Sequence, residues 1–272
     1  MTITRLSFWQ AQKNTARIGS IPAGAFWVSP RLAKMRKRRA KKPMRHWRKS
    51  VFAAHISVTI LQGAALAHKA KIRSIIFASG SGTNAANLIR HAAENPDFSV
   101  AAVICDNPAA GVIEKCAALD LPCHVIPFES SKHNHEEKIR TALAHYDADW
   151  IFLAGYMRIL SAEFIAEFYD SALGCARIVN IHPSLLPAFR GKDAYQRAFT
   201  ENVPESGVTV HFVDSGIDTG PIILQRRFPR KSDDTLESFT ARGMALEYQT
   251  YIDAVALLLQ QLQNKNFQEK RA

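Results

Sequence analysis

The sequence predicts an α/β protein with one mostly parallel, twisted sheet, an antiparallel pair of strands near its C-terminal end and a long closing helix. Three features support this prediction. Apolar runs begin at Ile72 and recur at short intervals. Helix-compatible stretches separate the first five runs, which is the pattern of βαβ units. Only a turn that contains Gly216 separates the last two runs, so we expect these two to pair antiparallel.

The strands are expected at the apolar runs, in chain order, and the helices between them. The strand runs are Ile72–Ala78, Val100–Cys105, Cys123–Ile126, Trp150–Ala154, Arg177–Ile181, Val208–Val213 and Ile222–Phe228. The intervening helices are expected over Asn84–Glu94, Gly111–Leu119, His133–His145 and Ser161–Tyr169. A closing helix is expected over about Thr235–Leu262, where apolar residues recur at helix-like spacing. These are Leu236, Phe239, Met244, Tyr251, Val255 and Leu259.

The positive charge of the chain is concentrated in its N-terminal segment. The whole chain has a formal charge of +11, and residues 1–70 contain 15 Lys and Arg and no Asp or Glu. Residues 71–272 therefore contain 20 basic and 24 acidic residues, a formal charge of −4. We predict two parts: a basic extension over 1–70, expected to be disordered, and one catalytic domain over 71–272.

The extension has three interpretations. Its dense basic run, Lys34–Lys49, precedes a mildly apolar stretch, Val51–Ala67, as in a signal or transit peptide, but it begins far from Met1. That stretch is also too short and polar for a comfortable membrane span. Basic residues around Trp47 could bind nucleic acid, although no folded nucleic-acid module surrounds them. The third interpretation is a tail without a catalytic role, and this includes a true start near Lys71.

The four cysteines have no C-x-x-C spacing, and we interpret them as reduced residues of an intracellular protein. They are Cys105, Cys116, Cys123 and Cys175. We therefore expect neither a disulfide framework nor a metal site.

A glycine-rich loop follows the first expected strand. It reads Ser79-Gly-Ser-Gly-Thr-Asn84 and leads directly into a helix. Backbone N–H groups at a helix start attract anions, so we expect a phosphate-bearing ligand here. The loop lacks the full G-x-G-x-x-G spacing, since position 85 is Ala, and a turn that only packs strand on helix is the alternative interpretation.

Three polar residues near strand ends form the candidate catalytic group. Asn180 and His182 are two positions apart, so on an extended segment they point to the same face. Pro183 removes a ladder donor and favours the end of the strand there. Asp218 follows the next apolar run and could orient the imidazole. An amide donor with an imidazole suits acyl transfer, although each residue alone also has a purely structural interpretation.

The combination of these motifs closely resembles the phosphoribosylglycinamide formyltransferases, folate-dependent enzymes of purine synthesis, over about residues 71–260. The motifs are Ser79–Asn84, Leu153–Leu160, Asn180–Pro187 and Asp218–Ile223. The resemblance implies a single Rossmann-like formyltransferase domain. Methionyl-tRNA formyltransferases and formyltetrahydrofolate deformylases share the Asn, His and Asp elements, but the glycine-rich loop and the Pro after His182 favour the glycinamide enzymes.

The resemblance also implies roles for individual residues. Those implied to be catalytic are Asn180, His182 and Asp218. Those implied to bind glycinamide ribonucleotide are Gly82, Thr83, Asn84 and Glu247. Those implied to line the folate cleft are Met157, Arg158, Ile159, Leu160 and Asn180. The family often has an Arg that contacts folate where this chain reads Phe128–Lys132, so Ser131 or Lys132 remains open for that contact.

The implied reaction moves the formyl group of 10-formyltetrahydrofolate, the co-substrate, to the amine of glycinamide ribonucleotide, without a metal. Asn180 and a protonated His182 would stabilise the oxyanion, with Asp218 keeping the imidazole charged. The alternatives are hydrolysis of formyltetrahydrofolate, or nucleic-acid or membrane-surface binding through the basic extension. We expect two small-molecule partners, no nucleic-acid or membrane partner, a monomer or weak homodimer, and a cytoplasmic location.

Overall fold

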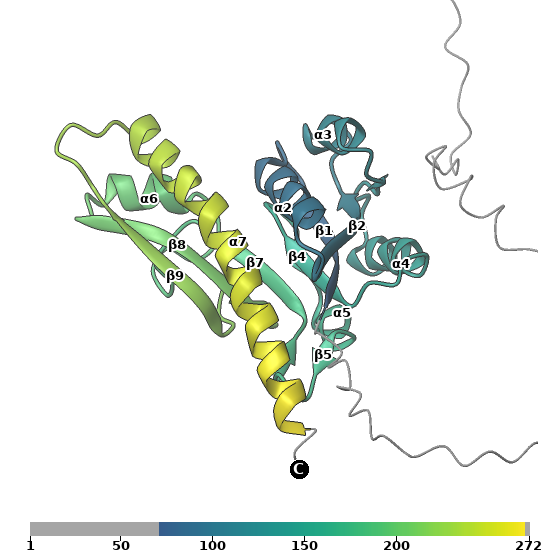
Figure 1. Cartoon of the computed structure of the whole chain (residues 1–272). Helices are drawn as coiled ribbons and strands as arrows, with labels where there is room; N and C mark the ends of the chain where they lie inside the picture. The colour runs from purple at the N-terminus through teal and green to yellow at the C-terminus, as the bar shows by residue number, and fades with distance from the viewer. Residues whose placement is uncertain (1–70, 270–272) are drawn as a thin grey trace, which may run out of the picture. The chain divides into compact units, whose positions relative to one another are not determined.

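The computed structural model describes residues 71–269, with side chains to position 264, and all of these residues belong to one compact unit (Figure 1). The predicted extension over 1–70 lies outside the described residues and stays a prediction. Among the described helices, none combines the length and apolar character needed to cross a bilayer.

A seven-stranded mixed sheet forms the centre of the fold, in the order β3-β2-β1-β4-β7-β8-β9. Its strands are β1 Ile72–Ala78, β2 Phe98–Cys105, β3 Cys123–Val125, β4 Trp150–Leu153, β7 Ile178–His182, β8 Glu205–Phe212 and β9 Ile222–Pro229. Strands β3, β2, β1, β4 and β7 run parallel, whereas β8 pairs antiparallel with both β7 and β9. The predicted fold class and the predicted antiparallel pair are therefore confirmed.

Helices cover both faces of the sheet. They are α2 Thr83–Glu94, α3 Val112–Ala118, α4 Lys132–Leu143, α5 Ala162–Ala166, α6 Ala194–Thr200 and α7 Leu236–Glu269. Alternate residues of β1 face opposite sides, as the period of a strand requires. Ile76 packs in a core cluster with α2, α3 and α7, and Phe77 packs in a second cluster with α4 and α5.

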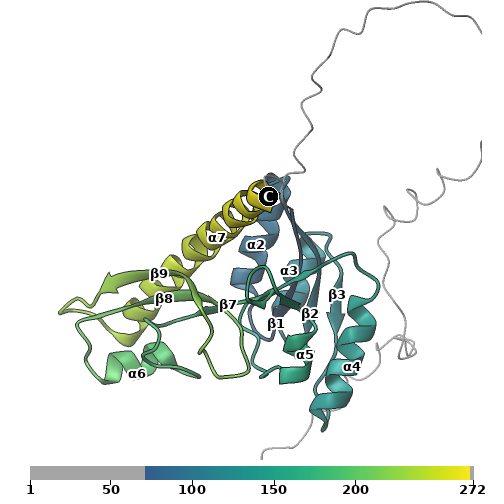
Figure 2. The ribbon, with the colours of Figure 1, turned by 90° about the horizontal axis from the view of Figure 1, so that it is seen from below.

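The structure adds short elements that the sequence patterns did not predict. Along the chain, helix α6 follows β7 and precedes β8. Figure 2 shows it with β8 and β9 at the end of the domain opposite β3 and α4. A second, two-stranded antiparallel sheet joins β5 Tyr169–Asp170 to β6 Cys175–Ala176. Strands of two residues, such as β5 and β6, are too short to show a hydrophobic period.

The closing helix α7 is confirmed, but it continues beyond the predicted end at Leu262 to Glu269. Of the six apolar residues that predicted it, Phe239, Tyr251 and Val255 are completely buried, whereas Met244 is exposed. The hydroxyl of Tyr251 donates to the carbonyl of Leu153 at 2.9 Å and contacts that of Val179 at 3.2 Å. Helix α7 is thereby fixed to the last residue of β4, which lines the cleft described next, and to the second residue of β7.

Candidate active site

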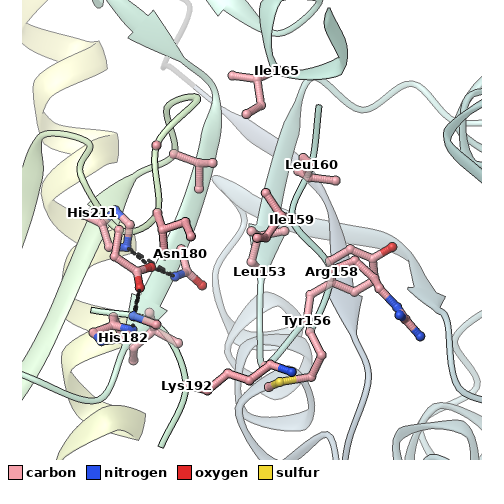
Figure 3. Close-up of a pocket in the computed structure, with 18 of the residues that line it drawn as sticks. Leu153, Tyr156, Arg158, Ile159, Leu160, Ile165, Asn180, His182, Lys192 and His211 are labelled. Carbon is pink, nitrogen blue, oxygen red and sulfur yellow. Dashed lines mark hydrogen bonds and ion pairs between the residues drawn. The ribbon is translucent and has the colours of Figure 1, made fainter. Parts of the chain in front are cut away.

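A cleft of about 750 Å³ opens where β4 and β7 end. Figure 3 shows Asn180, His182 and His211 on one wall and Tyr156, Arg158, Ile159 and Leu160 on the other. Ligands of open α/β sheets bind at this carboxyl edge of the parallel strands. The cleft has the size and mixed lining of a small-molecule site.

The three predicted catalytic side chains converge at this edge. Strand β7 ends at His182, as Pro183 predicted, and both Asn180 and His182 line the cleft. Asp218 lies in the loop between β8 and β9, with φ at 51°, in the left-handed region that Asp tolerates better than most residues. Its Oδ2 lies 3.3 Å from His182 Nδ1, and its Oδ1 lies 3.4 Å from Asn180 Nδ2. Their catalytic roles stay a prediction.

His211 belongs to the same cluster and was not predicted. Its side chain is almost completely buried, and its Nδ1 lies 2.8 Å from the carbonyl oxygen of Phe212. Its Nε2 lies 3.2 Å from Asn180 Nδ2 and 3.5 Å from Asp218 Oδ1. The antiparallel register of β7 and β8 places it directly opposite Asn180. Only that pairing, which the sequence patterns did not indicate, could have identified it.

Burial sets the protonation of the cluster. It lowers the pKa of His182, although the Phe189 carbonyl and Asp218 both act to raise it. Burial alone would raise the pKa of Asp218, but the neighbouring His211 side chain and the hydrogen bond from the Gly191 N–H lower it to about 2. This direction runs against the expectation that Asp218 keeps His182 charged, which stays a prediction. A pKa below the ordinary value favours the neutral imidazole at neutral pH, because desolvation outweighs the carboxylate.

The glycine-rich loop begins helix α2. Gly82 is its N-cap, with φ at 73°, and a Cβ there would lie 2.5 Å from the Cβ of Val112. A glycine is required for both reasons, so close packing on α3 also explains it. Thr83 accepts a hydrogen bond from Lys115 Nζ at 3.3 Å, which brings an unpredicted positive charge to the loop. A positive charge and a helix N-terminus together suit a phosphate.

Asn84 and Glu247 meet in the cleft although 163 positions separate them. Asn84 Nδ2 donates to Glu247 Oε2 at 2.7 Å, and the buried Oδ1 of Asn84 has no hydrogen-bond donor within the described part of the chain. Burial raises the pKa of Glu247, and its hydrogen bonds from Asn84 and Tyr195 oppose that rise. Of the predicted nucleotide-binding residues, these two line the cavity, whereas Gly82 and Thr83 lie outside its lining.

Of the predicted folate-binding residues, Asn180 lies on the wall with His182, and the others lie on the opposite wall. Met157, Arg158, Ile159 and Leu160 all line the cleft, and so does Lys132. Ser131 instead caps helix α4 and accepts a hydrogen bond from the Asn134 N–H at 3.2 Å. The structure thus favours Lys132 over Ser131 as the residue that would contact folate, the choice that the sequence left open.

Arg158 is held by two neighbours at the mouth of the cleft. Its Nε donates to Asp106 Oδ2 at 2.6 Å, and its guanidinium lies 4.6 Å from the centroid of the Phe128 ring. Neither Asp106 nor Phe128 was among the predicted site residues. Together they fix the direction of the one arginine among the predicted folate contacts.

All four cysteines are free thiols in the structure, and Cys105 and Cys116 are buried. Within residues 71–269 no three His, Cys, Asp or Glu side chains gather in a way that could hold a metal ion. The expectation of a metal-free reaction stays a prediction.

Comparisons with known proteins agree with this geometry. The family model described as formyl transferase matches residues 72–255. The chain is 41% identical over 187 residues to phosphoribosylglycinamide formyltransferase of Bacillus subtilis, covering 68% of this chain and 93% of that protein. It is 34% identical over 193 residues to the trifunctional purine biosynthetic protein adenosine-3 of Homo sapiens, covering 70% of this chain but only 18% of that protein.

Solved structures give the same result. Phosphoribosylglycinamide formyltransferase from Bacillus halodurans superposes with a TM-score of 0.63 at 40% identity, covering 69% of this chain and 95% of that one. Glycinamide ribonucleotide transformylase 1 from Symbiobacterium toebii superposes with a TM-score of 0.65 at 35% identity, covering 70% and 88%.

Proposed function

The chain belongs to the formyl transferase family, and we propose that it is the enzyme that moves the formyl group of 10-formyltetrahydrofolate to the amine of glycinamide ribonucleotide in purine synthesis. The products are N-formylglycinamide ribonucleotide and tetrahydrofolate. The observation that supports this most is the match to 93% of the length of a protein named phosphoribosylglycinamide formyltransferase. Neither alternative function receives support from the comparisons.

His182 moves the proton in the proposed reaction. Its Nε2 donates to the Phe189 carbonyl at 2.8 Å, which leaves Nδ1 of the neutral ring able to accept a proton. When the amine nitrogen attacks the formyl carbon, that nitrogen must lose a proton, and Nδ1 takes it. The resulting imidazolium lies 3.3 Å from the Asp218 carboxylate, which stabilises it. The proton then passes to the folate nitrogen as its bond to the formyl carbon breaks.

Asn180 stabilises the negative charge that forms on the formyl oxygen. Its amide nitrogen has two N–H groups, and His211 Nε2 lies close to this nitrogen at 3.2 Å. The contact to Asp218 Oδ1 is long, at 3.4 Å, so the formyl oxygen competes with it for the other N–H. His211 and Asp218 therefore hold a donor in place before the charge develops, which is how preorganised sites lower a barrier.

A direct assay tests this function. Purified protein is mixed with 10-formyltetrahydrofolate, with and without glycinamide ribonucleotide, and tetrahydrofolate and formate are both measured. We expect tetrahydrofolate only when the nucleotide is present, and little formate in either case. If the same amount of formate is released with and without the nucleotide, the protein is a formyltetrahydrofolate hydrolase and the proposed transferase function is wrong.

We also propose that residues 71–272 are sufficient for catalysis and that no metal takes part. Deletion of residues 1–70 should leave kcat unchanged, and so should prior treatment with a chelator. Loss of activity on deletion would assign the extension a role in the reaction.

A further inference from the structure

The carboxylate of Glu247 has a second hydrogen-bond donor behind the cleft wall. The hydroxyl of Tyr195 donates to Glu247 Oε1 at 2.8 Å, while Asn84 donates to Oε2. Tyr195 is on α6 and Glu247 is on α7, and these two helices pack against each other. Both side chains are more than nine-tenths buried, but only Glu247 lines the cleft.

The ring of Tyr195 occupies space that a glycine provides. A Cβ at Gly243, one helical turn before Glu247, would lie 2.5 Å from the Tyr195 hydroxyl oxygen. The ring also contacts the rings of Phe228 and Phe239 edge-on, with centroids 6.3 Å and 6.2 Å away. The hydroxyl is therefore held on the carboxylate from three sides.

We propose that Tyr195 is a positioning residue for nucleotide binding, which it serves by fixing the carboxylate of Glu247 toward the cleft. The inference rests on the proposed function, in which Glu247 contacts glycinamide ribonucleotide. Tyr195 touches no substrate itself, because it lies outside the lining of the cleft.

The physical reason is the cost of a charge in a buried place. A carboxylate taken out of water needs hydrogen-bond donors to remain ionised and to keep one orientation. Without the Tyr195 hydroxyl, Oε1 of Glu247 would have no donor, and the carboxylate could rotate or bind a proton. Either change removes an aligned acceptor from the nucleotide and leaves the formyl-transfer cluster at His182 unaffected.

The test is the variant Tyr195→Phe, which keeps the ring and removes only the hydroxyl. We expect KM for glycinamide ribonucleotide to rise about tenfold, as for loss of a hydrogen bond to a charged group. KM for 10-formyltetrahydrofolate and kcat should stay within about twofold. Tyr169→Phe is the matched control, since Tyr169 is exposed and lies outside the cleft lining, and it should change none of the three constants.

A double-mutant cycle shows whether Tyr195 acts through Glu247. In a Glu247→Gln background, Tyr195→Phe should raise KM for the nucleotide less than twofold, because the charge it positions is already absent. Equal effects in both backgrounds would overturn the inference. If Tyr195→Phe lowers the Tm by more than a few degrees, Gly243→Ala provides the second variant, since its Cβ displaces the same hydroxyl, and it should raise the same KM.

The outcomes separate this inference from the proposed function. If the unaltered enzyme does not use glycinamide ribonucleotide, the proposed function fails. If it does, and the folded Tyr195→Phe variant keeps the original KM for the nucleotide, only the positioning role is wrong.

Discussion

The two walls of the cleft differ in how their side chains are held. On the β7–β8 wall, Asn180, His182 and Asp218 are tied to one another and to the buried His211. On the opposite wall, Met157 and Ile159 keep 59% and 57% of their surface in solvent. The first wall is arranged before any ligand arrives, whereas the second exposes apolar surface to the cleft that a bound ligand would cover.

This difference suggests that the first wall serves the chemical step and the second wall serves ligand affinity. Polar groups that are fixed in advance act on charge that develops during the reaction, so they affect kcat. Exposed apolar side chains gain by leaving water, which they do equally for ground state and transition state, so they affect KM. Substitutions on the two walls should therefore change different kinetic constants.

The largest effect is expected from His182→Ala. Removal of the group that moves the proton should lower kcat by roughly 10²–10⁴-fold, with both KM values nearly unchanged. Steady-state kinetics and a thermal melt of the same preparation check this. If the variant keeps more than a tenth of the original kcat, the wall that carries His182 does not carry out the chemical step.

Asp218→Asn should have the next largest effect, because the carboxylate stabilises the imidazolium that forms on His182. Hydrogen bonds to charged groups contribute about 1.5–3 kcal/mol, so loss of this interaction should lower kcat roughly 10–100-fold. Neutral His182 is the active form, so kcat/KM falls as the pH drops below the His182 pKa. Since Asp218 acts to raise that pKa, its loss should move this acidic limb to lower pH. If the acidic limb of the pH profile does not move, Asp218 has only a structural role in its turn.

The pKa of Asp218 also predicts a stability change. Its pKa is about 2 in the folded protein against an ordinary value of 3.8, so its contribution is complete above pH 3.8 and is lost as the pH falls from 3.8 to 2. Urea unfolding at several pH values should show this loss in the original protein. The Asp218→Asn variant, which has no carboxyl to protonate, is the control.

Glu247→Gln should raise KM for glycinamide ribonucleotide about tenfold and leave kcat nearly unchanged. Because burial raises the pKa of Glu247 above its ordinary value of 4.5, stability falls as the pH rises from 4.5, and this loss is complete once the pH exceeds the raised pKa. The neutral amide removes this cost, so Tm at pH 7 should be unchanged or higher. A large fall in Tm would show that the carboxylate holds α7 in place rather than binding the nucleotide.

The smallest effect is expected from Met157→Ala on the exposed wall. Removal of its side chain should raise KM for 10-formyltetrahydrofolate less than about tenfold and leave kcat unchanged. Ile222→Ala is the control, because Ile222 is also exposed but lies outside the cleft lining. A fall in kcat for Met157→Ala would contradict the claim that the two walls affect different kinetic constants.

Most of the fold could be predicted from sequence because its elements have strong local signals. The apolar run at Ile72–Ala78 is a strand buried on both sides of the sheet, and the stripe with Phe239 and Tyr251 is the buried face of α7. A short window of sequence is enough to show either pattern. The two-stranded β5–β6 sheet was missed because each of its strands has only two residues. Helix α6 was also missed, although it is as long as the predicted α3. Met244 was placed on the buried stripe, yet it is exposed, because the packing of each turn of α7 depends on what lies beneath it.

The residues of the site were identified mainly by resemblance, and the sequence alone could not arrange them. It did determine the strand end at His182, where proline follows, and the turn at Gly82, where the backbone needs φ at 73°. Such features depend on neighbouring residues and on steric limits of the backbone. Tertiary structure alone decided that His211 faces Asn180, that Tyr195 reaches Glu247, and that burial lowers the pKa of His182. Those outcomes depend on strand register, helix packing and burial, which join residues far apart in the chain.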